Sequence, residues 1–328
     1  MTTGHPLVSI IIPAYQCQAT LGRTLESVRQ QGYAPIEIIV MDVGSTDATS
    51  QIAAEAAAAD PRIHYFRQAN QGPAAARNAA VARASGEYLA FMDHDDEWQP
   101  GKLQQQADLL SQHGDIDFIF TESLEVDAAQ GRAEPLLAGR YARALGTLER
   151  QALAGQADVF LVSAASLRPV VFNLGFITLS SVMLRRGLFE QLGGFDTARR
   201  GTDDVDFWVR ATRRARFAYC AQPLTLHHHH RSNMSQASAT WHTEIIRHLQ
   251  MALVSPDYAD LRPLALARLR ERYRWLIFFY GRHGQPRQAW AAWRESRAEG
   301  FDGLSALGAL GAWLGPLPFR AVGRLLWS

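Results

Sequence analysis

Short apolar runs alternate with segments of helical periodicity along the N-terminal third of the chain. The apolar runs predict buried β-strands at residues 8–12, 36–41, 63–66, 88–92 and 117–121. Between them, apolar residues recur at spacings of three and four, which predicts helices at residues 20–31, 47–59, 74–84 and 100–113. Strands that alternate with helices form βαβ units, so the sequence predicts an α/β fold with a mostly parallel sheet.

The remainder of the chain has three parts. Residues 125–170 carry no clear period, and we expect an insertion with one or two helices there. A second ordered block follows, with a predicted strand at 176–184, a helix at 186–192, a helix from Asp203, and strands around Phe217 and Leu224. Beyond Gln236 the pattern is wholly helical. We therefore expect a boundary near residue 238, with one domain at 1–238 and a helical region at 239–328.

Composition and charge exclude several classes of protein. Of the 328 residues, 47% are hydrophobic and 20% are charged, and the formal net charge is +1, which fits a globular chain and excludes a disordered one. We expect no nucleic-acid partner, because the chain lacks a basic excess. Its two cysteines, Cys17 and Cys220, are too few for a disulfide framework and favour a reducing compartment.

The sequence predicts neither a signal peptide nor a membrane span. The apolar run at residues 7–12 follows no basic segment and ends at Pro13, so it predicts a buried strand. The most apolar tail, residues 303–327, is interrupted by prolines and arginines before it reaches the roughly 20 apolar residues that cross a bilayer. We therefore expect a cytoplasmic protein.

A carboxylate and a tight turn follow the second predicted strand. Asp42 comes directly after the apolar run, and Gly44-Ser45-Thr46-Asp47 leads into the next helix. Helix capping explains the hydroxyl groups and Asp47, but it does not explain Asp42. Ligands collect at the carboxyl ends of parallel strands, so Asp42 is a candidate to bind a base imide or a ribose hydroxyl.

Three carboxylates follow the strand predicted at residues 88–92, in the sequence Asp93-His94-Asp95-Asp96. Like charges at one strand end repel one another, and a divalent cation is the usual compensation. Alternate residues of an extended segment point the same way, so Asp93 and Asp95 can address one group, and their oxygens suit Mg²⁺ or Mn²⁺. The alternative is a solvated acidic loop that caps the helix near Pro100.

In this order, the motifs resemble those of family 2 glycosyltransferases with the GT-A fold. The likeness rests on residues 8–15, on the turn at 42–47, on Asn70-Gln71-Gly72 with Ala76-Arg77-Asn78, and on Gly86-Glu87-Tyr88 before the acid cluster. It resumes at 181–185, at Gly193-Gly194-Phe195-Asp196 and at 203–210. The resemblance covers residues 7–235 apart from the insertion. It implies a Rossmann-like GT-A sheet flanked by helices, with a helical C-terminal extension.

The resemblance also implies a nucleotide-sugar donor, a UDP- or dTDP-sugar, and a divalent cofactor, Mn²⁺ or Mg²⁺. The residues implied to bind the donor are Pro13, Tyr15, Asp42, Arg77, Asp93 and His94. The implied metal ligands are Asp93, Asp95 and His230. His230 ends a run of four histidines and precedes a short serine-containing loop, as a histidine of the family often does; a surface histidine cluster is the alternative.

The pair Asp203-Asp204 supplies the implied catalytic acids. Asp204 matches the acid that activates the acceptor, which implies that it takes a proton from an acceptor hydroxyl as this attacks the anomeric carbon from the opposite face and inverts it. Asp203 is the second candidate. Without the resemblance, both would be explained as acids favoured at a helix start.

Two departures from the family pattern affect these expectations. Val43 stands where the family commonly has a second acid, which weakens any nucleotide contact at that position. Processive members carry Gln-x-x-Arg-Trp and membrane helices, and the nearest match here is residues 271–275 in a chain without an expected span. We therefore expect transfer of a single sugar to a saccharide or lipid-linked acceptor, in bacterial surface polysaccharide or glycoconjugate synthesis.

The tail at residues 259–328 is rich in arginine and tryptophan, and this composition fits more than one binding partner. Helices of this composition can lie peripherally on an anionic membrane surface, on the inner face of the cell membrane, or can pack on the catalytic domain or a second subunit.

Two other functions of the chain also remain. A nucleotidyltransferase shares the fold type, although its glycine- and lysine-bearing phosphate loop is missing here, and a non-enzymatic nucleotide-sugar-binding protein is the third possibility.

Overall fold

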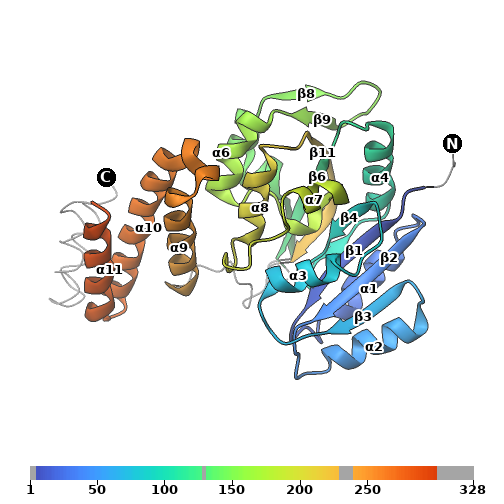
Figure 1. Cartoon of the computed structure of the whole chain (residues 1–328), viewed down its shortest axis with the longest axis horizontal. Helices are drawn as coiled ribbons and strands as arrows, with labels where there is room; N and C mark the ends of the chain where they lie inside the picture. Colours follow the sequence, from blue (N-terminus) through green and yellow to red (C-terminus); the bar gives the residue numbers. More distant parts are fainter. Residues whose placement is uncertain (1–4, 128–130, 229–238, 301–328) are drawn as a thin grey trace. The chain divides into compact units, whose positions relative to one another are not determined.

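The structure is a computed structural model that describes residues 5–127, 131–228 and 239–300 (Figure 1). The chain divides into two compact units, residues 1–233 and 234–328. The predicted boundary near residue 238 falls within 229–238, outside the described residues, and stays a prediction.

The first unit is built on one large sheet. Its main path runs in the order β3-β2-β1-β4-β10-β6-β11-β9-β8. The strands are β3 (Ile63–Arg67), β2 (Ile36–Asp42), β1 (Val8–Ala14), β4 (Tyr88–Phe91), β10 (Val182–Arg185), β6 (Phe118–Asp127), β11 (Phe217–His228), β9 (Val159–Val162) and β8 (Arg150–Ala152). Along this path only β10 and β9 run against the others, so the predicted mostly parallel α/β sheet is confirmed.

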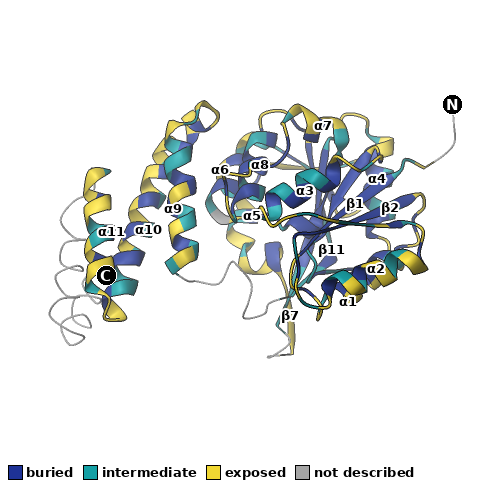
Figure 2. Cartoon of the chain, turned by 60° about the horizontal axis from the view of Figure 1, so that its bottom comes forward, coloured by how far each residue is buried: buried dark blue, intermediate teal, exposed yellow. Residues whose placement is uncertain are grey.

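Helices pack on both faces of this sheet, and their buried sides turn toward it (Figure 2). They are α1 (Leu21–Arg29), α2 (Thr49–Ala59), α3 (Pro73–Val81), α4 (Lys102–Gln112), α6 (Ala164–Leu174), α7 (Arg186–Gln191) and α8 (Asp203–Ala211). In α1 the buried Leu21, Leu25 and Val28 follow the spacing of three and four that predicted the helix. Strand β1 is buried at all seven positions, as expected for a strand covered on both faces.

Three details differ from the sequence expectations. The strand expected at 176–184 begins only at Val182, after a 3₁₀ turn at Leu179–Ser181. The two strands expected around Phe217 and Leu224 form one strand, β11, whose pairing with β6 shifts register near Pro223. The insertion contains α5 (Ala142–Thr147) and α6, but also β7 (Arg132–Pro135), β8 and β9. All residues of β7 and β8 are exposed, so no alternation of apolar and polar positions could predict them.

One charged side chain lies deep in the first unit. Lys102, the only lysine of the sequence, is fully buried at the start of α4. Its Nζ lies 2.7 Å from Oε1 of Gln106 and 4.1 Å from the ring centroid of Trp98. Burial lowers the pKa of the amine well below its ordinary value.

The second unit is helical over its described residues, as the sequence predicts. It contains α9 (Ala239–Val254), a 3₁₀ segment at Pro256–Leu261, α10 (Arg262–Arg282) and α11 (Pro286–Ala298). Residues 301–328, the end of the predicted tail, lie outside the described residues. Within the described part of the chain, no helix combines the length and apolar character needed to cross a bilayer.

Candidate active site

The candidate site lies where β1, β2 and β4 end. These strands are parallel neighbours, and the register pairs Ala14, the last residue of β1, with Asp42, the last residue of β2. The acid cluster Asp93-His94-Asp95-Asp96 follows β4 on the other side of β1. The parallel sheet therefore brings three of the predicted donor-binding segments to one edge.

Asp42 is fully buried and organises the turn that follows it. Its Oδ1 accepts a hydrogen bond from the backbone N–H of Ser45 at 2.8 Å, and its Oδ2 accepts one from the Tyr65 hydroxyl at 3.0 Å. The Arg67 guanidinium lies 3.8 Å away and also donates to the carbonyl of Ser45. Tyr65 and Arg67 come from β3, whose sequence carries no motif, so sequence reasoning missed them.

The segment after β1 is joined to this turn. Gln16 donates its backbone N–H to the Ser45 hydroxyl at 3.1 Å and its side-chain amide to Thr46 at 2.8 Å. Pro13 is buried within β1, whereas Tyr15 is 46% exposed at the strand end. Of these two predicted residues, only Tyr15 therefore presents an accessible ring at the edge of the sheet.

Arg77 on α3 connects the acid cluster to the predicted catalytic pair. Its guanidinium donates to Oδ1 of Asp93 at 2.9 Å and to Oδ2 of Asp203 at 2.7 Å. Burial opposes the positive charge of Arg77, but the two carboxylates raise its pKa above the ordinary value. The guanidinium thus stays charged in a buried position and holds both acids in place.

The two acids of the predicted catalytic pair, Asp203 and Asp204, have different surroundings in the first turn of α8. Phe207 and Trp208 are fully buried in an aromatic cluster with Phe118 and Phe195, which fixes the start of the helix. Asp203 is buried, and burial raises its pKa against the pull of Arg77.

Asp204 is partly exposed, and its Oδ1 accepts the N–H of Val205 at 2.7 Å. Burial, with the nearby charge of Asp203, raises the pKa of Asp204 to about 7. A carboxyl group with this pKa exchanges its proton at neutral pH.

The predicted residues His94 and Asp95 lie in a loop that α1 holds. Nδ1 of His94 lies 3.3 Å from the Thr20 hydroxyl. Arg23 donates to the carbonyl of Asp95 at 3.0 Å, and the Thr24 hydroxyl is within 2.8 Å of the carbonyls of both His94 and Asp96. The loop is therefore fixed through its backbone on the side of α1.

Two histidines at the end of β11 contact the acids that follow the predicted metal ligands. Nδ1 of His227 lies 3.0 Å from Oδ1 of Asp96, and Nε2 of His228 lies 2.7 Å from Oε1 of Glu97. Burial lowers the pKa of His227, but Asp96 outweighs it and raises the pKa to about 9. His230, the predicted metal ligand, lies outside the described residues.

The donor set of the acid cluster fits a divalent cation of the Mg²⁺ or Mn²⁺ type. Asp93 and Asp95 offer carboxylate oxygens and are both partly exposed. Among the described residues, no three His, Cys, Asp or Glu side chains form a metal site by themselves. Mg²⁺ commonly binds through one or two carboxylates, water and substrate phosphates, so two carboxylates suffice.

Asn78, the neighbour of Arg77, holds the segment that leads to α8. Its side-chain amide donates to the Phe195 carbonyl at 2.8 Å and accepts the Phe195 N–H at 2.9 Å. Gly194 has a φ of 73°, and a Cβ there would lie 2.8 Å from Oδ1 of Asn78. The motif containing Arg77 and Asn78 thus holds both Asp203 of the predicted catalytic pair and the glycine-rich segment before α8.

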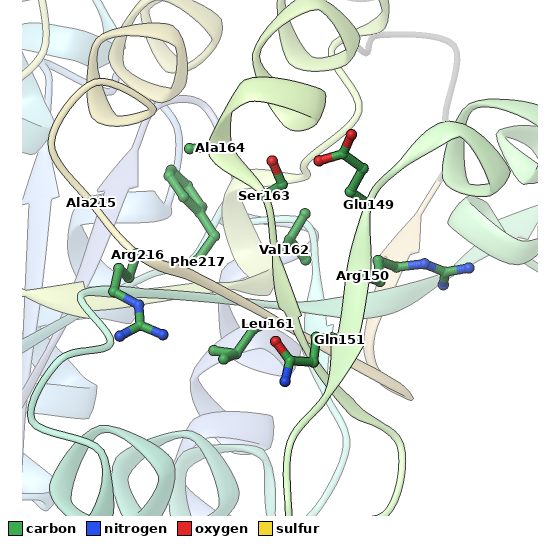
Figure 3. Close-up of a pocket in the computed structure, with 10 residues that line it drawn as sticks. All are labelled: Glu149, Arg150, Gln151, Leu161, Val162, Ser163, Ala164, Ala215, Arg216 and Phe217. Carbon is green, nitrogen blue, oxygen red and sulfur yellow. The ribbon is translucent and has the colours of Figure 1, made fainter.

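A pocket of about 440 Å³ lies elsewhere, beside α6, β8 and β9 (Figure 3). It is lined by Phe217, the first residue of β11, whereas the candidate site lies at the ends of the parallel strands. Arg216 in its wall is already paired with Asp115. The pocket is therefore separate from the predicted site residues.

The N-terminal half of the chain matches known glycosyltransferases in sequence. Residues 9–168 match the family model described as "Glycosyl transferase family 2". A "Putative teichuronic acid biosynthesis glycosyltransferase TuaG" of Bacillus subtilis is 40% identical over 122 residues, which are 37% of this chain and 48% of the relative. Chondroitin synthase of Escherichia coli is 34% identical over 122 residues, 37% of this chain and 18% of that protein. The chain spans about half the length of the first two curated relatives it matches.

Solved structures share the fold. Staphylococcus aureus TarS in complex with UDP-GlcNAc superimposes with a TM-score of 0.57 at 19% identity, covering 81% of this chain and 72% of that chain. The mannosyltransferase PcManGT from Pyrobaculum calidifontis, in complex with GDP-Man and Mn²⁺, gives a TM-score of 0.53 at 20% identity, covering 97% and 83%. At these identities the likeness concerns the fold.

Proposed function

We propose that this chain transfers one sugar from a UDP- or dTDP-sugar to an acceptor hydroxyl, with inversion and with help from a divalent cation. The match of residues 9–168 to the family 2 glycosyltransferase model and the GT-A fold shared with solved glycosyltransferases support this proposal. The observation that carries the proposal is the double ion pair of Arg77. One buried guanidinium lies within 2.9 Å of an acid of the predicted metal cluster and within 2.7 Å of an acid of the predicted catalytic pair. The donor and the base would thus meet at one place.

The donor nucleotide would occupy the edge formed by β1 and β2. Asp42 would accept a hydrogen bond from the imide N–H of uracil or thymine, after exchanging one of its present partners. Tyr15, exposed at the end of β1, would pack against the base or ribose. Asp42 and Tyr15 would therefore select the nucleotide.

Asp93 and Asp95 would hold the cation together with the diphosphate oxygens. A bound Mn²⁺ or Mg²⁺ stabilises the negative charge that develops on a nucleoside diphosphate leaving group. Arg77 keeps one oxygen of Asp93 in place, so this carboxylate is oriented before the donor arrives. Preorganised groups of this kind need no reordering during the reaction.

Asp204 would act as the general base. With a pKa of about 7, a substantial fraction of the Asp204 carboxyl groups is deprotonated at neutral pH. The carboxylate is still basic enough to take the acceptor proton. Asp203 would instead keep Arg77 in place, because its carboxylate is buried and paired with the guanidinium. Asp204 would thus transfer the proton, and Asp203 would hold Arg77 in position.

The acceptor is proposed to be a saccharide or a lipid-linked saccharide of bacterial surface polysaccharide synthesis. The relative named for teichuronic acid biosynthesis supports this class. We further propose a cytoplasmic location with peripheral membrane contact through the helical unit. That unit exposes Val254, Leu266 and Trp290, and α10 carries six arginines and one glutamate. Liposome co-sedimentation tests this contact: the chain should sediment with anionic liposomes but not with neutral ones. If it sediments with neither kind of liposome, the proposed contact is refuted.

Binding of the donor diphosphate tests the proposed function. Calorimetry of the wild-type chain with UDP, dTDP and GDP, each with Mn²⁺ and with EDTA, should reveal one or two diphosphates that bind more tightly with the metal than in EDTA. Asp95→Ala should abolish this dependence. Asp115→Ala, an exposed acid paired with Arg216, serves as the matched control and should bind as the wild type does.

Turnover separates the proposal from its alternatives. With donor, metal and acceptor, a glycosyltransferase releases a nucleoside diphosphate, whereas a nucleotidyltransferase releases pyrophosphate from a nucleoside triphosphate and a sugar phosphate. A binding protein releases neither. Absence of metal-dependent diphosphate binding in the wild type would overturn the proposed function.

A further inference from the structure

We propose that Asp96 is a positioning residue rather than a metal ligand. Through Ser180 it fixes the backbone of Asp93, and through His227 it ties the acid loop to the end of β11. The inference rests on the proposed function, because the group that Asp96 aligns is the metal- and diphosphate-binding pair Asp93 and Asp95.

Both carboxylate oxygens of Asp96 are occupied by protein groups. Oδ2 accepts a hydrogen bond from the Ser180 hydroxyl at 2.6 Å. Oδ1 lies 3.0 Å from Nδ1 of His227 and accepts the backbone N–H of His228 at 3.3 Å. The residue is 1% exposed, whereas the side chain of Asp93 is 33% exposed. Asp96 therefore points into the protein, away from the face that Asp93 and Asp95 present.

Ser180 transmits the position of Asp96 to Asp93. The backbone N–H of Asp93 donates to the Ser180 hydroxyl at 3.0 Å, so the serine must use its own proton toward Asp96. The Ser180 carbonyl in turn accepts the indole N–H of Trp98 at 2.7 Å. Ser180 is fully buried, and the chain of donors therefore runs in one direction, from Asp93 through Ser180 to Asp96.

The same carboxylate joins the loop to a neighbouring strand. The acid loop leads into β5 (Glu97–Trp98), which pairs with β11 at Leu226 and Thr225. His227 and His228 follow directly and close on Asp96 and Glu97. Asp96 thus fixes the acid loop against β11, while Thr24 and Arg23 fix its opposite side through backbone carbonyls.

Two variants distinguish positioning from metal ligation. Ser180→Ala removes the hydroxyl that links the acids but leaves every carboxylate in place. Asp96→Asn keeps the size of the side chain and changes one oxygen into a donor. If Asp96 acts through Ser180, both variants should lower the affinity for UDP (or for dTDP or GDP, whichever the wild type binds) in Mn²⁺ by at least about tenfold. The double variant should be no weaker than Asp96→Asn, because groups in one network are not additive.

Ser181→Ala is the matched control, since the neighbouring buried serine donates to the carbonyl of Thr178 instead. It should bind as the wild type does, and in EDTA all variants should bind diphosphate with wild-type affinity. The inference is overturned if Ser180→Ala keeps wild-type affinity in Mn²⁺. If Asp96→Asn loses affinity while Ser180→Ala keeps it, Asp96 is a metal ligand and not a positioning residue. It is also overturned if affinity falls equally with and without metal, since that indicates general damage.

The wild type serves to separate the two proposals. If it binds no diphosphate in Mn²⁺, the proposed function fails and this inference fails with it. If it binds and the variants bind equally well, the inference alone fails.

Discussion

The guanidinium of Arg77 lies 2.7 Å from the carboxylate of Asp203, although 126 positions separate the two residues in the sequence. The contact joins α3 to the first turn of α8 and occupies Asp203 with a structural partner. Asp204, the next residue, instead accepts the N–H of Val205 within its own helix turn. Because the two adjacent acids have different partners, we expect them to have different roles, and the first prediction tests this.

Asp204→Asn should lower the turnover number by about 10² to 10⁴ and leave donor affinity unchanged. The variant keeps the size of the side chain and the oxygen that accepts the Val205 N–H, but it cannot take a proton. Single-turnover kinetics with saturating donor measure the loss. At pH 8 the thermal midpoint of the variant should equal or exceed that of the wild type, because it no longer carries a partly buried negative charge. Near-normal transfer would remove Asp204 from the mechanism.

The pH profile of transfer should report the raised pKa of Asp204. A general base works only when deprotonated, so kcat/KM should fall on the acid side of pH 7, about tenfold per pH unit at the low end. Stability should respond in the opposite direction. The folded state binds the proton more tightly than the unfolded state, so this group stabilises the fold at low pH and loses that contribution as pH rises through about 7. Rates measured between pH 5.5 and 8.5 that do not change would contradict the assignment.

Arg77→Met should destabilise the first unit, because it leaves the buried carboxylate of Asp203 without its cation. Removing one member of a buried ion pair costs about 3–5 kcal/mol. Arg77→Met combined with Asp203→Asn should recover part of the free energy of unfolding, since the buried charge is removed as well. Urea denaturation measures each value, with Arg83→Met, an exposed arginine on α3's C-terminal side, as control. Equal stability of Arg77→Met and the wild type would show that the pair contributes little.

Lys102 should make stability depend on pH above neutrality. Its pKa is depressed in the folded state, whereas the unfolded chain binds the proton up to a pKa of about 10.4. In the interval between the two values the unfolded state holds one more proton, so the free energy of unfolding should rise by up to about 1.4 kcal/mol per pH unit. Lys102→Met lacks this dependence. Urea denaturation of both proteins at pH 7, 8 and 9 gives their free energies of unfolding, and the two plots against pH should converge or cross. A constant difference between the two free energies would refute the lowered pKa of Lys102.

The sequence predicted the edge of the sheet at which the site lies, because that information is local. Each predicted strand of the first half is a mainly apolar run, and Asp42 and Asp93 stand directly after such runs. In a parallel sheet these positions must meet. The placement of the acids at one edge therefore needed no knowledge of distant contacts.

The partners of those acids could not be predicted, because they come from distant segments without a period of their own. Ser180 lies in a stretch whose apolar composition predicted a strand, yet it forms a 3₁₀ turn whose hydroxyl reaches Asp93 and Asp96. Tyr65 reaches Asp42 from β3 as one ordinary strand residue. The rule that alternate residues of an extended segment point the same way relates the acids only to their neighbours in the sequence. It could not predict which of the acids Ser180 and His227 bind.

The contact between Asn78 and Gly194 also constrains how this chain can diverge. A side chain at position 194 would contact the Asn78 amide and would require a left-handed backbone. A substitution there would therefore displace the Asn78 side chain and, with it, Phe195. We therefore expect the two positions to change together among descendants of this sequence. Because Arg77 is the neighbour of Asn78, a substitution at Gly194 would also disturb the ion pair between Arg77 and Asp203, and we expect few residues to be tolerated at position 194.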